Sequence, residues 1–152
     1  MAFRFPAQRI HEIVRSAKVV REGQPAEFRR IGGPSATMTV ELDLMDGPFV
    51  DLKLIVSASD ASNRETYSAA LILEGARVRG IDYVPVGRRK RFKVRIPKGW
   101  HENVEDPNLP RGHDDQNRHR EMPDFSPTDL ADFLRRVTRH WNIETLSEPT
   151  LL

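Results

Sequence analysis

The amino-acid sequence predicts a two-layer α+β domain, in which an N-terminal and a C-terminal helix pack on a mostly antiparallel sheet of about five strands. Apolar residues recur at helical spacing in the segments 6–20 and 126–141, and between them apolar and polar residues alternate as in half-buried strands. Helices segregated from an antiparallel sheet are typical of α+β domains. With 152 residues the chain can bury one core, so we expect a single domain over 1–146 and a frayed tail over 147–152.

The starts of both helices carry recognisable signals. Pro6 suits the first turn of the N-terminal helix. The C-terminal helix is expected to begin with Ser126 as its N-cap, Pro127 at the first helical position and Asp129 completing a capping-box-like pair. With helices expected near both ends, the strands of the sheet are expected in the middle of the chain.

Four strands are expected in the middle of the chain, where alternating or β-compatible residues are bounded by turns. Asp46-Gly47-Pro48 is the turn between the first two strands. Glu74-Gly75 predicts a tight hairpin, so the third and fourth strands should pair antiparallel. The four strands are placed at 36–44, 52–56, 67–73 and 76–84.

A fifth strand is expected over 91–96, where every second residue is apolar and the others are basic. The wider segment 77–98 carries nine basic residues against one acid, Asp82. Such clustering favours a polyanionic partner, RNA or DNA, although a solvated cationic sheet face explains it equally well. The residues of this strand that we expect to contact nucleic acid are Arg91, Lys93 and Arg95.

The thirty residues 97–126 show no sustained apolar period and are expected to form a long loop before the last helix. Connections longer than about 12–15 residues without secondary structure are uncommon in compact domains, and are usually either functional or disordered. This segment contains three of the five histidines, His101, His113 and His119. Catalytic side chains are therefore expected here first.

These histidines suit phosphodiester cleavage in RNA without a metal. Two imidazoles in opposite protonation states can deprotonate a ribose hydroxyl and protonate the leaving oxygen. We select His113 and His119 as this pair, with Asp82 to orient one of them. Arg79 and Arg118 are expected to hold the phosphate. A cross-strand pairing of Asp82 with a neighbouring arginine is the simpler, structural interpretation of that carboxylate.

A metal site is the alternative interpretation of the same segment. His113, Asp114, Asp115 and His119 offer imidazole and carboxylate ligands suited to zinc, manganese or magnesium. However, the H-x5-H spacing is not a recognised helix-face pair, and adjacent aspartates often serve in loops and turns. We therefore expect no metal and no other cofactor, and keep a metal-dependent enzyme acting on a small phosphorylated substrate as a third possibility.

Composition and missing motifs exclude several other classes. The chain has no cysteine, which excludes disulfides, thiol nucleophiles and cysteine-ligated zinc. No apolar run approaches the ~20 residues needed to cross a bilayer, and no signal peptide is recognised, so we expect a cytoplasmic protein without membrane contact. There is no glycine-rich phosphate loop, no HExxH and no serine–histidine–acid arrangement, which leaves little support for nucleotide hydrolysis or acyl transfer.

From about residue 69 to residue 141, a strand ending in R-x-x-D is followed by a histidine-bearing loop and a short, acid-capped helix. This pattern resembles the TumE-type toxins of bacterial toxin–antitoxin modules, with Arg79, Asp82, His113 and His119 as the matching residues. It covers about half of the chain. Those toxins tend to carry a compact H-x-H group, whereas this chain has H-x5-H. The resemblance implies an RNA-directed toxin that a separate antitoxin protein neutralises.

The leading hypothesis is thus an RNA-directed protein, a metal-independent endoribonuclease of a toxin or phage-defence module. The competing hypothesis is a non-enzymatic module of a phage or mobile element, whose basic strand and long segment bind nucleic acid or a partner protein. Binding to nucleic acid should weaken steeply with salt, because each neutralised phosphate releases counterions.

Overall fold

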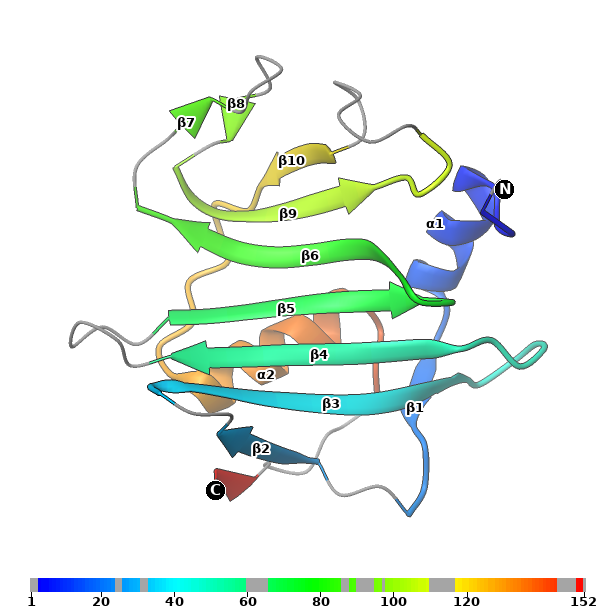
Figure 1. Ribbon diagram of the computed structural model, residues 1–152, viewed down its shortest axis with the longest axis horizontal. Helices are drawn as coiled ribbons and strands as arrows, with labels where there is room; N and C mark the ends of the chain where they lie inside the picture. Colours follow the sequence, from blue (N-terminus) through cyan, green and yellow to red (C-terminus); the bar gives the residue numbers. More distant parts are fainter. Residues whose placement is uncertain are drawn as a thin grey trace.

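A computed structural model describes residues 3–23, 26–30, 33–59, 66–85, 88–89, 95–96, 98–109, 117–144 and 150–151. Figure 1 shows one large twisted sheet with two helices, so the predicted α+β class is confirmed. The prediction of about five strands is too low, because the strand order is β10-β9-β6-β5-β4-β3-β2-β11, with β1 also paired to β3. The elements are α1 (Ala7–Arg15), β1 (Lys18–Val20), β2 (Glu27–Arg30), β3 (Ser35–Leu44), β4 (Leu52–Ser59), β5 (Thr66–Leu73), β6 (Ala76–Val84), β7 (Arg88–Arg89), β8 (Arg95–Ile96), β9 (Gly99–Glu105), β10 (Asn117–Glu121), α2 (Leu130–His140) and β11 (Thr150–Leu151).

The core lies on one face of the sheet. Val40, Leu54 and Leu71 stand side by side across β3, β4 and β5 and are fully buried. Their neighbours along each strand point to the other face, as the alternation predicts. The β5/β6 hairpin pairs antiparallel, with Glu74 and Gly75 at its turn in positive φ, so that prediction is confirmed.

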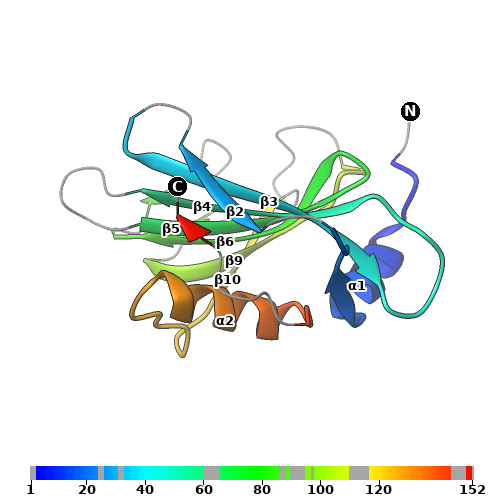
Figure 2. The same cartoon turned by 90° about the horizontal axis from the view of Figure 1, so that it is seen from below.

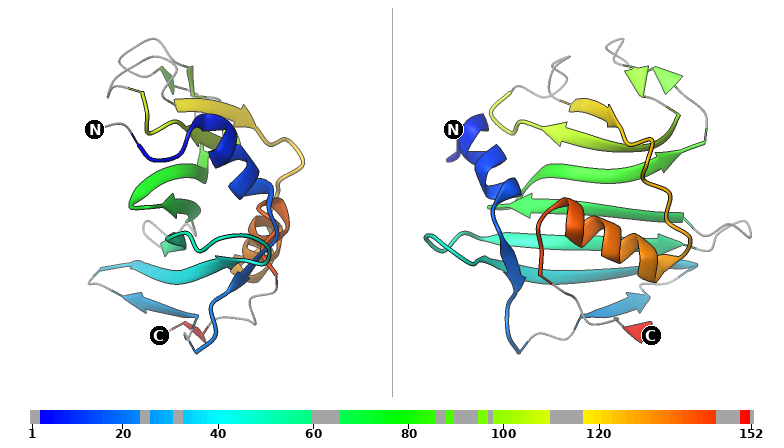
Figure 3. Two further views of the ribbon diagram at one scale, coloured as in Figure 1. Left: turned by 90° about the vertical axis from the view of Figure 1, so that its right-hand side faces the viewer. Right: turned by 180° about the vertical axis from the view of Figure 1, so that it is seen from behind.

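Both helices cover this apolar face. Figures 2 and 3 show α1 and α2 on the same side of the sheet, while Figure 1 looks onto the face that neither helix covers. Ile10 and Ile13 of α1 and Phe133 and Val137 of α2 are buried against the sheet. The sheet therefore has a helix-covered face and an open face.

The helix bounds differ from those expected. α1 ends at Arg15 rather than near residue 20, because Lys18–Val20 pair with β3 as strand β1. α2 begins at Leu130, and its N-cap is Asp129 rather than Ser126. The backbone N–H of Asp132 donates to the Asp129 carboxylate at 2.7 Å, and the Asp132 carboxylate accepts from the backbone of the residue before Asp129. Asp129 and Asp132 thus form the reciprocal cap, and the helix N-cap lies three residues later than the expected Ser126.

Part of the predicted long loop is strand. β9 pairs with β6 and β10 pairs with β9. The prediction of a loop over 97–126 is therefore wrong for the seven residues of β9 and the five residues of β10. Residues 110–116 lie outside the described residues. β9 was not predicted because a glutamate, Glu102, stands between Trp100 and Val104 on its helix-covered face, which interrupts the apolar alternation. Trp100 nevertheless fixes it by packing on Phe125 and Phe133.

The predicted basic strand is only partly described. Arg95–Ile96 pair with Arg88–Arg89 in a separate two-stranded unit, not with the main sheet. Residues 91–94 lie outside the described residues. In the main sheet β9 takes the place beside β6. Of the tail 147–152, Thr150–Leu151 pair in parallel with β2.

One buried cation joins the two helix ends. Lys18 is fully buried, and its Nζ donates to the carbonyl oxygens of Val14 (2.5 Å), Ser16 (2.7 Å) and Trp141 (2.6 Å). Val14 lies in the last turn of α1, and Trp141 is the C-cap of α2. The three ammonium hydrogens therefore meet three carbonyl oxygens at the negative ends of two helix dipoles.

Candidate active site

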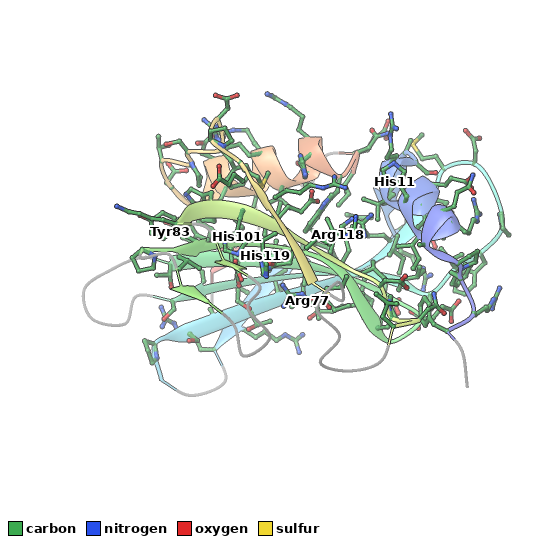
Figure 4. The ribbon with its side chains drawn as sticks, turned by 90° about the horizontal axis from the view of Figure 1, so that it is seen from above. His11, Arg77, Tyr83, His101, Arg118 and His119 are labelled. Atoms are coloured by element: carbon green, nitrogen blue, oxygen red, sulfur yellow. The ribbon has the colours of Figure 1, made fainter. Side chains whose placement is uncertain are left out.

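Five polar side chains from three neighbouring strands gather on the open face. The register pairs Asp82 of β6 directly with His101 of β9, and Asn103 of β9 directly with His119 of β10. Residues directly opposite one another in an antiparallel pair point to the same face. Together with Arg77 they form what we call the open-face cluster, near the β10 edge of the sheet. Figure 4 labels three of its members, His101, His119 and Arg77.

A bulge sends Arg77 to this face. The β5/β6 register shifts between Leu71 and Ile72, so Arg77 pairs with Ile72 while Arg79 pairs with Leu71. Leu71 and Ile72 point to opposite faces, and so do Arg77 and Arg79, although they are two positions apart. Arg77 Nε lies 3.2 Å from Glu105 Oε1, which holds the guanidinium across the strands.

His101 is held between two acceptors. Its Nε2 lies 2.6 Å from Asp82 Oδ1, its Nδ1 lies 3.2 Å from the carbonyl oxygen of Gly99, and the residue is 1% exposed. A neutral imidazole carries one N–H, whereas the cationic ring has two. The geometry therefore suits the imidazolium form, paired with the Asp82 carboxylate.

Asp82 is the solvent-facing member of this pair. Its side chain is 39% exposed although Oδ1 is buried, and Asn103 Nδ2 donates to Oδ2 at 3.4 Å. Burial raises the pKa of Asp82, but the hydrogen bond and charge of His101, with Arg77 and Asn103, outweigh it, so the pKa lies below its ordinary value. Asp82 is thus an anionic carboxylate on a partly exposed side chain.

His119 completes the site on the edge strand. Its ring centroid lies 5.4 Å from that of His101, in an edge-to-face arrangement. Both of its ring nitrogens are shielded from solvent. The cluster thus combines a second imidazole, a fixed imidazolium and a carboxylate, which are the groups that acid–base chemistry needs.

The backbone at Gly80 makes room for Arg77. A Cβ atom at this position would collide with the Arg77 guanidinium, so glycine lets that side chain lie flat on the strand. We expect Gly80→Ala to dislodge Arg77 while lowering the melting temperature little, because a flexible side chain can move away. Loss of the Arg77–Glu105 pair, seen in a crystal structure of the variant, would verify this.

A double-mutant cycle provides the control for Gly80. In an Arg77→Gln background, Gly80→Ala should change neither the melting temperature nor any activity further, because the side chain it displaces is already gone. An equally large effect in both backgrounds would show that Gly80 acts through something other than Arg77.

The predicted site residues divide between the two faces. Asp82 and His119 both lie in the open-face cluster, on either side of β9. Arg79 and Arg118 both pair with Val104 and point to the helix-covered face, away from the histidines. Figure 4 shows Arg118 displaced towards α1 relative to Arg77.

Other predicted residues cannot be placed. His113, Arg91 and Lys93 lie outside the described residues, and only the backbone of Arg95 is described. Asp82 contacts a histidine, and no described arginine lies within ion-pair distance of it. The simpler interpretation of Asp82 as an arginine partner is therefore not seen.

Sequence reasoning considered His101 among the candidate histidines without selecting it, and missed Asn103. Their spacing of two was the available signal, since on a strand it places both on one face. Asp114 and Asp115 lie outside the described residues, and in the described part of the chain no three potential ligands gather to hold a metal. Neither described helix is long and apolar enough to cross a membrane.

Behind the open-face cluster, a second polar group lies on the helix-covered face. Trp141 Nε1 donates to Glu102 Oε2 at 2.8 Å, and His140 Nε2 lies 3.1 Å from the same oxygen. Burial raises the pKa of Glu102, but His140, Trp141 and the charge of Arg79 outweigh it and lower the pKa below its ordinary value. Glu102 therefore ties α2 to β9.

Comparison of the chain with protein-family models, with curated proteins and with solved structures gives no match. The resemblance to TumE-type toxins, and the antitoxin partner it implies, therefore stay predictions. Any function has to be argued from the two polar sites themselves.

Proposed function

We propose that this protein is a metal-independent endoribonuclease whose active site is the open-face cluster. The observation that carries the proposal is the partly exposed Asp82 carboxylate, which is held anionic by buried His101, whose ring lies 5.4 Å from that of a second histidine, His119. RNA is the fitting substrate because its 2′-hydroxyl is an internal nucleophile, so base and acid are the only groups the protein has to supply.

Each member of the cluster has a distinct role. Asp82 Oδ2 removes the proton from the 2′-hydroxyl, whose oxygen attacks the adjacent phosphorus. The P–O5′ bond breaks, and protonated His119 donates a proton to the leaving oxygen, which yields a 2′,3′-cyclic phosphate. His101 is a positioning residue that keeps Asp82 anionic. Arg77 contributes positive charge for the phosphorane that forms.

Two features of the site refine this mechanism. The ring nitrogens of His119 are shielded, so the shielding groups must move before the proton is transferred. His101 is buried, and both of its ring nitrogens contact protein oxygens. Proton exchange with the substrate is therefore assigned to Asp82 and His119. We therefore propose Asp82 and His119 as the catalytic pair, whereas the pair expected from the sequence, His113 and His119, stays a prediction because His113 lies outside the described residues.

The test is cleavage of a mixed RNA by the purified protein, with and without chelator. We expect Asp82→Asn and His119→Ala each to lower the rate by about 100-fold or more, since a general acid or base contributes roughly 10²–10⁴. His11→Ala, which removes an exposed histidine of α1, is the matched control and should leave the rate unchanged. Cleavage should survive chelator and fail on DNA of the same sequence.

Two results would contradict the assignment. Cleavage that both substitutions leave intact would place the active site elsewhere in the chain. No cleavage by the wild-type protein, whether or not divalent metal is added, would reject the nuclease.

The pH profile offers a separate prediction. Because the pKa of Asp82 is lowered, its carboxylate stays ionised until the pH falls below the ordinary value of about 4. The rate should therefore hold through mild acid and fall only below about pH 4. A profile that loses activity between pH 7 and 5 with acidification would identify a histidine, not Asp82, as the base.

A non-enzymatic nucleic-acid-binding module is the second candidate. The observation that favours it is that His101 is buried and both ring nitrogens of His119 are shielded from solvent. Such a buried polar cluster can serve to hold the strands together and need not be catalytic. Such a module would bind RNA without cleaving it, and its affinity would fall steeply with added salt.

A further inference from the structure

A pocket of about 220 Å³ lies on the helix-covered face, between α1 and the edge strands β9 and β10. Three arginines line it, namely Arg79 of β6 and Arg118 and Arg120 of β10. The open-face cluster is on the opposite side of the same strands. This arginine pocket is therefore a separate site, which the proposed nuclease mechanism does not use.

The sheet register brings the three arginines together. Arg79 and Arg118 both lie opposite Val104, on either side of β9, and Arg120 follows two residues further along the edge strand. Arg79 is 4% exposed and its Nη1 donates to the carbonyl oxygen of Val78 at 2.8 Å. A buried guanidinium thus lies among the pocket walls, with two more accessible ones at the edge.

The three arginines form no close ion pair among the described residues. In the described part of the chain, none of the three arginines has a carboxylate within 4.0 Å. Burial and the like charge of Arg120 lower the pKa of Arg79, and Glu102 only partly offsets them. One acid, Glu102, offsets these three positive charges only in part, so a bound anion would relieve their repulsion.

The carboxylates of the pocket are already engaged. Glu105 pairs with Arg77 at 3.2 Å. Asp106 Oδ1 accepts from the backbone N–H of Asn108 at 2.9 Å and from its Nδ2 at 3.0 Å. Glu102, which lies opposite Arg120 in the β9/β10 register, accepts from Trp141. Within the described part of the chain, the guanidinium groups therefore have capacity to bind an external anion.

The helix beside the pocket adds to the positive potential. Ala7, the first residue of α1, lines the pocket. The N-cap Pro6 makes no side-chain hydrogen bond, and the first turn of this nine-residue helix has no acidic residue. Its uncapped N–H groups and the positive end of its dipole therefore favour an anion at this position.

We propose that the arginine pocket binds a phosphate monoester. A monoester presents three terminal oxygens and up to two charges, which three guanidinium groups can match, whereas a diester within an RNA chain presents two oxygens and one charge. The volume is below the 300 Å³ or so at which sites for whole drug-sized molecules begin, so the pocket takes the phosphate and little beyond it. The phosphate can belong to a small molecule or to the 5′ end of an RNA.

The probes are inorganic phosphate, ribose 5-phosphate, and one short deoxyribose oligonucleotide with either a 5′-phosphate or a 5′-hydroxyl, measured by titration calorimetry. Deoxyribose prevents cleavage by the proposed nuclease during the titration. We expect phosphate to bind and Arg118→Gln and Arg120→Gln each to weaken it about tenfold or more. Arg139→Gln, which removes an exposed arginine of α2, is the matched control and should bind like wild type.

The pattern of affinities identifies the source of the phosphate. A 5′-phosphorylated oligonucleotide that binds at least tenfold tighter than its 5′-hydroxyl form and than ribose 5-phosphate supports a nucleic-acid end. The reverse order supports a small phosphorylated molecule. Asp82→Asn should lose cleavage but retain phosphate binding. This variant therefore distinguishes failure of the proposed nuclease from failure of the arginine pocket. Absence of phosphate binding, or equal binding by the Arg118 and Arg120 variants and wild type, would overturn the proposal.

Discussion

Replacing Lys18 by methionine is expected to lower the free energy of unfolding by about 3 kcal/mol or more. The substitution keeps most of the side-chain volume but leaves three carbonyl oxygens, those of Val14, Ser16 and Trp141, without their donor. A buried acceptor left unsatisfied costs about 1–3 kcal/mol, and three are affected here. Chemical denaturation of both proteins would measure the difference in the free energy of unfolding, provided that the two m-values agree.

The matched control is Lys53→Met, at a partly exposed lysine of β4. It should change stability by less than about 0.5 kcal/mol, as surface substitutions usually do. Equal effects at the two positions would mean that the three carbonyl contacts add nothing beyond the general loss of a lysine.

The buried position of Lys18 also predicts a pH signature. Burial lowers its pKa from 10.5 to about 8 in the folded chain. Between these values the unfolded chain binds more protons than the folded one, so the free energy of unfolding should rise with pH across this window. Relative to Lys18→Met, the wild type should gain up to about 3 kcal/mol between pH 8 and 10.5. A constant difference between the two proteins over this range would contradict the burial argument.

The second large effect is expected at Glu102. Glu102→Ala removes the acceptor of Trp141 Nε1 and the carboxylate nearest to buried Arg79, which should destabilise the fold by about 3 kcal/mol. The contribution depends on pH. Because the pKa of Glu102 is lowered in the folded chain, this stability is present above about pH 4.5 and is lost as the pH falls through the folded value.

Thermal unfolding at neutral pH and below pH 4 would test both statements. The wild type should lose stability in acid more steeply than Glu102→Ala, which no longer has this carboxylate to protonate. Glu144→Ala, at an exposed glutamate after α2, is the matched control and should follow the wild type at both pH values. A Glu102 variant with wild-type stability at neutral pH would show that Trp141 and Arg79 find other partners.

Alternation predicted the central strands well because their two faces differ. In β3 to β5 one face is apolar and the other polar, so a period of two is visible in the sequence. β9 has no such contrast. His101 and Asn103 face one way and Glu102 the other, and all three are buried. His101 and Asn103 contact Asp82 of β6, and Glu102 accepts from Trp141, and a local sequence pattern does not contain these distant pairings.

The candidate site was predictable in part for the same geometrical reason. R-x-x-D places Arg79 and Asp82 three residues apart, and on a strand an odd spacing sends the two side chains to opposite faces. The sequence therefore already argued against one site containing both. The position of Arg77 could not be foreseen, because the bulge that reverses its direction depends on the pairing of β5 with β6.

The Lys18 contact has a consequence for the order of folding. Its hydrogen bond to Trp141 joins residues 123 positions apart, and the backbone of Lys18 also bonds to that of Asn142 and Glu144. The ammonium group can therefore reach its full set of acceptors only after nearly the whole domain has left the ribosome. Until then Lys18 can reach only the local carbonyl oxygens of Val14 and Ser16, so the link between the ends of α1 and α2 should form late, after synthesis of the C-terminal helix.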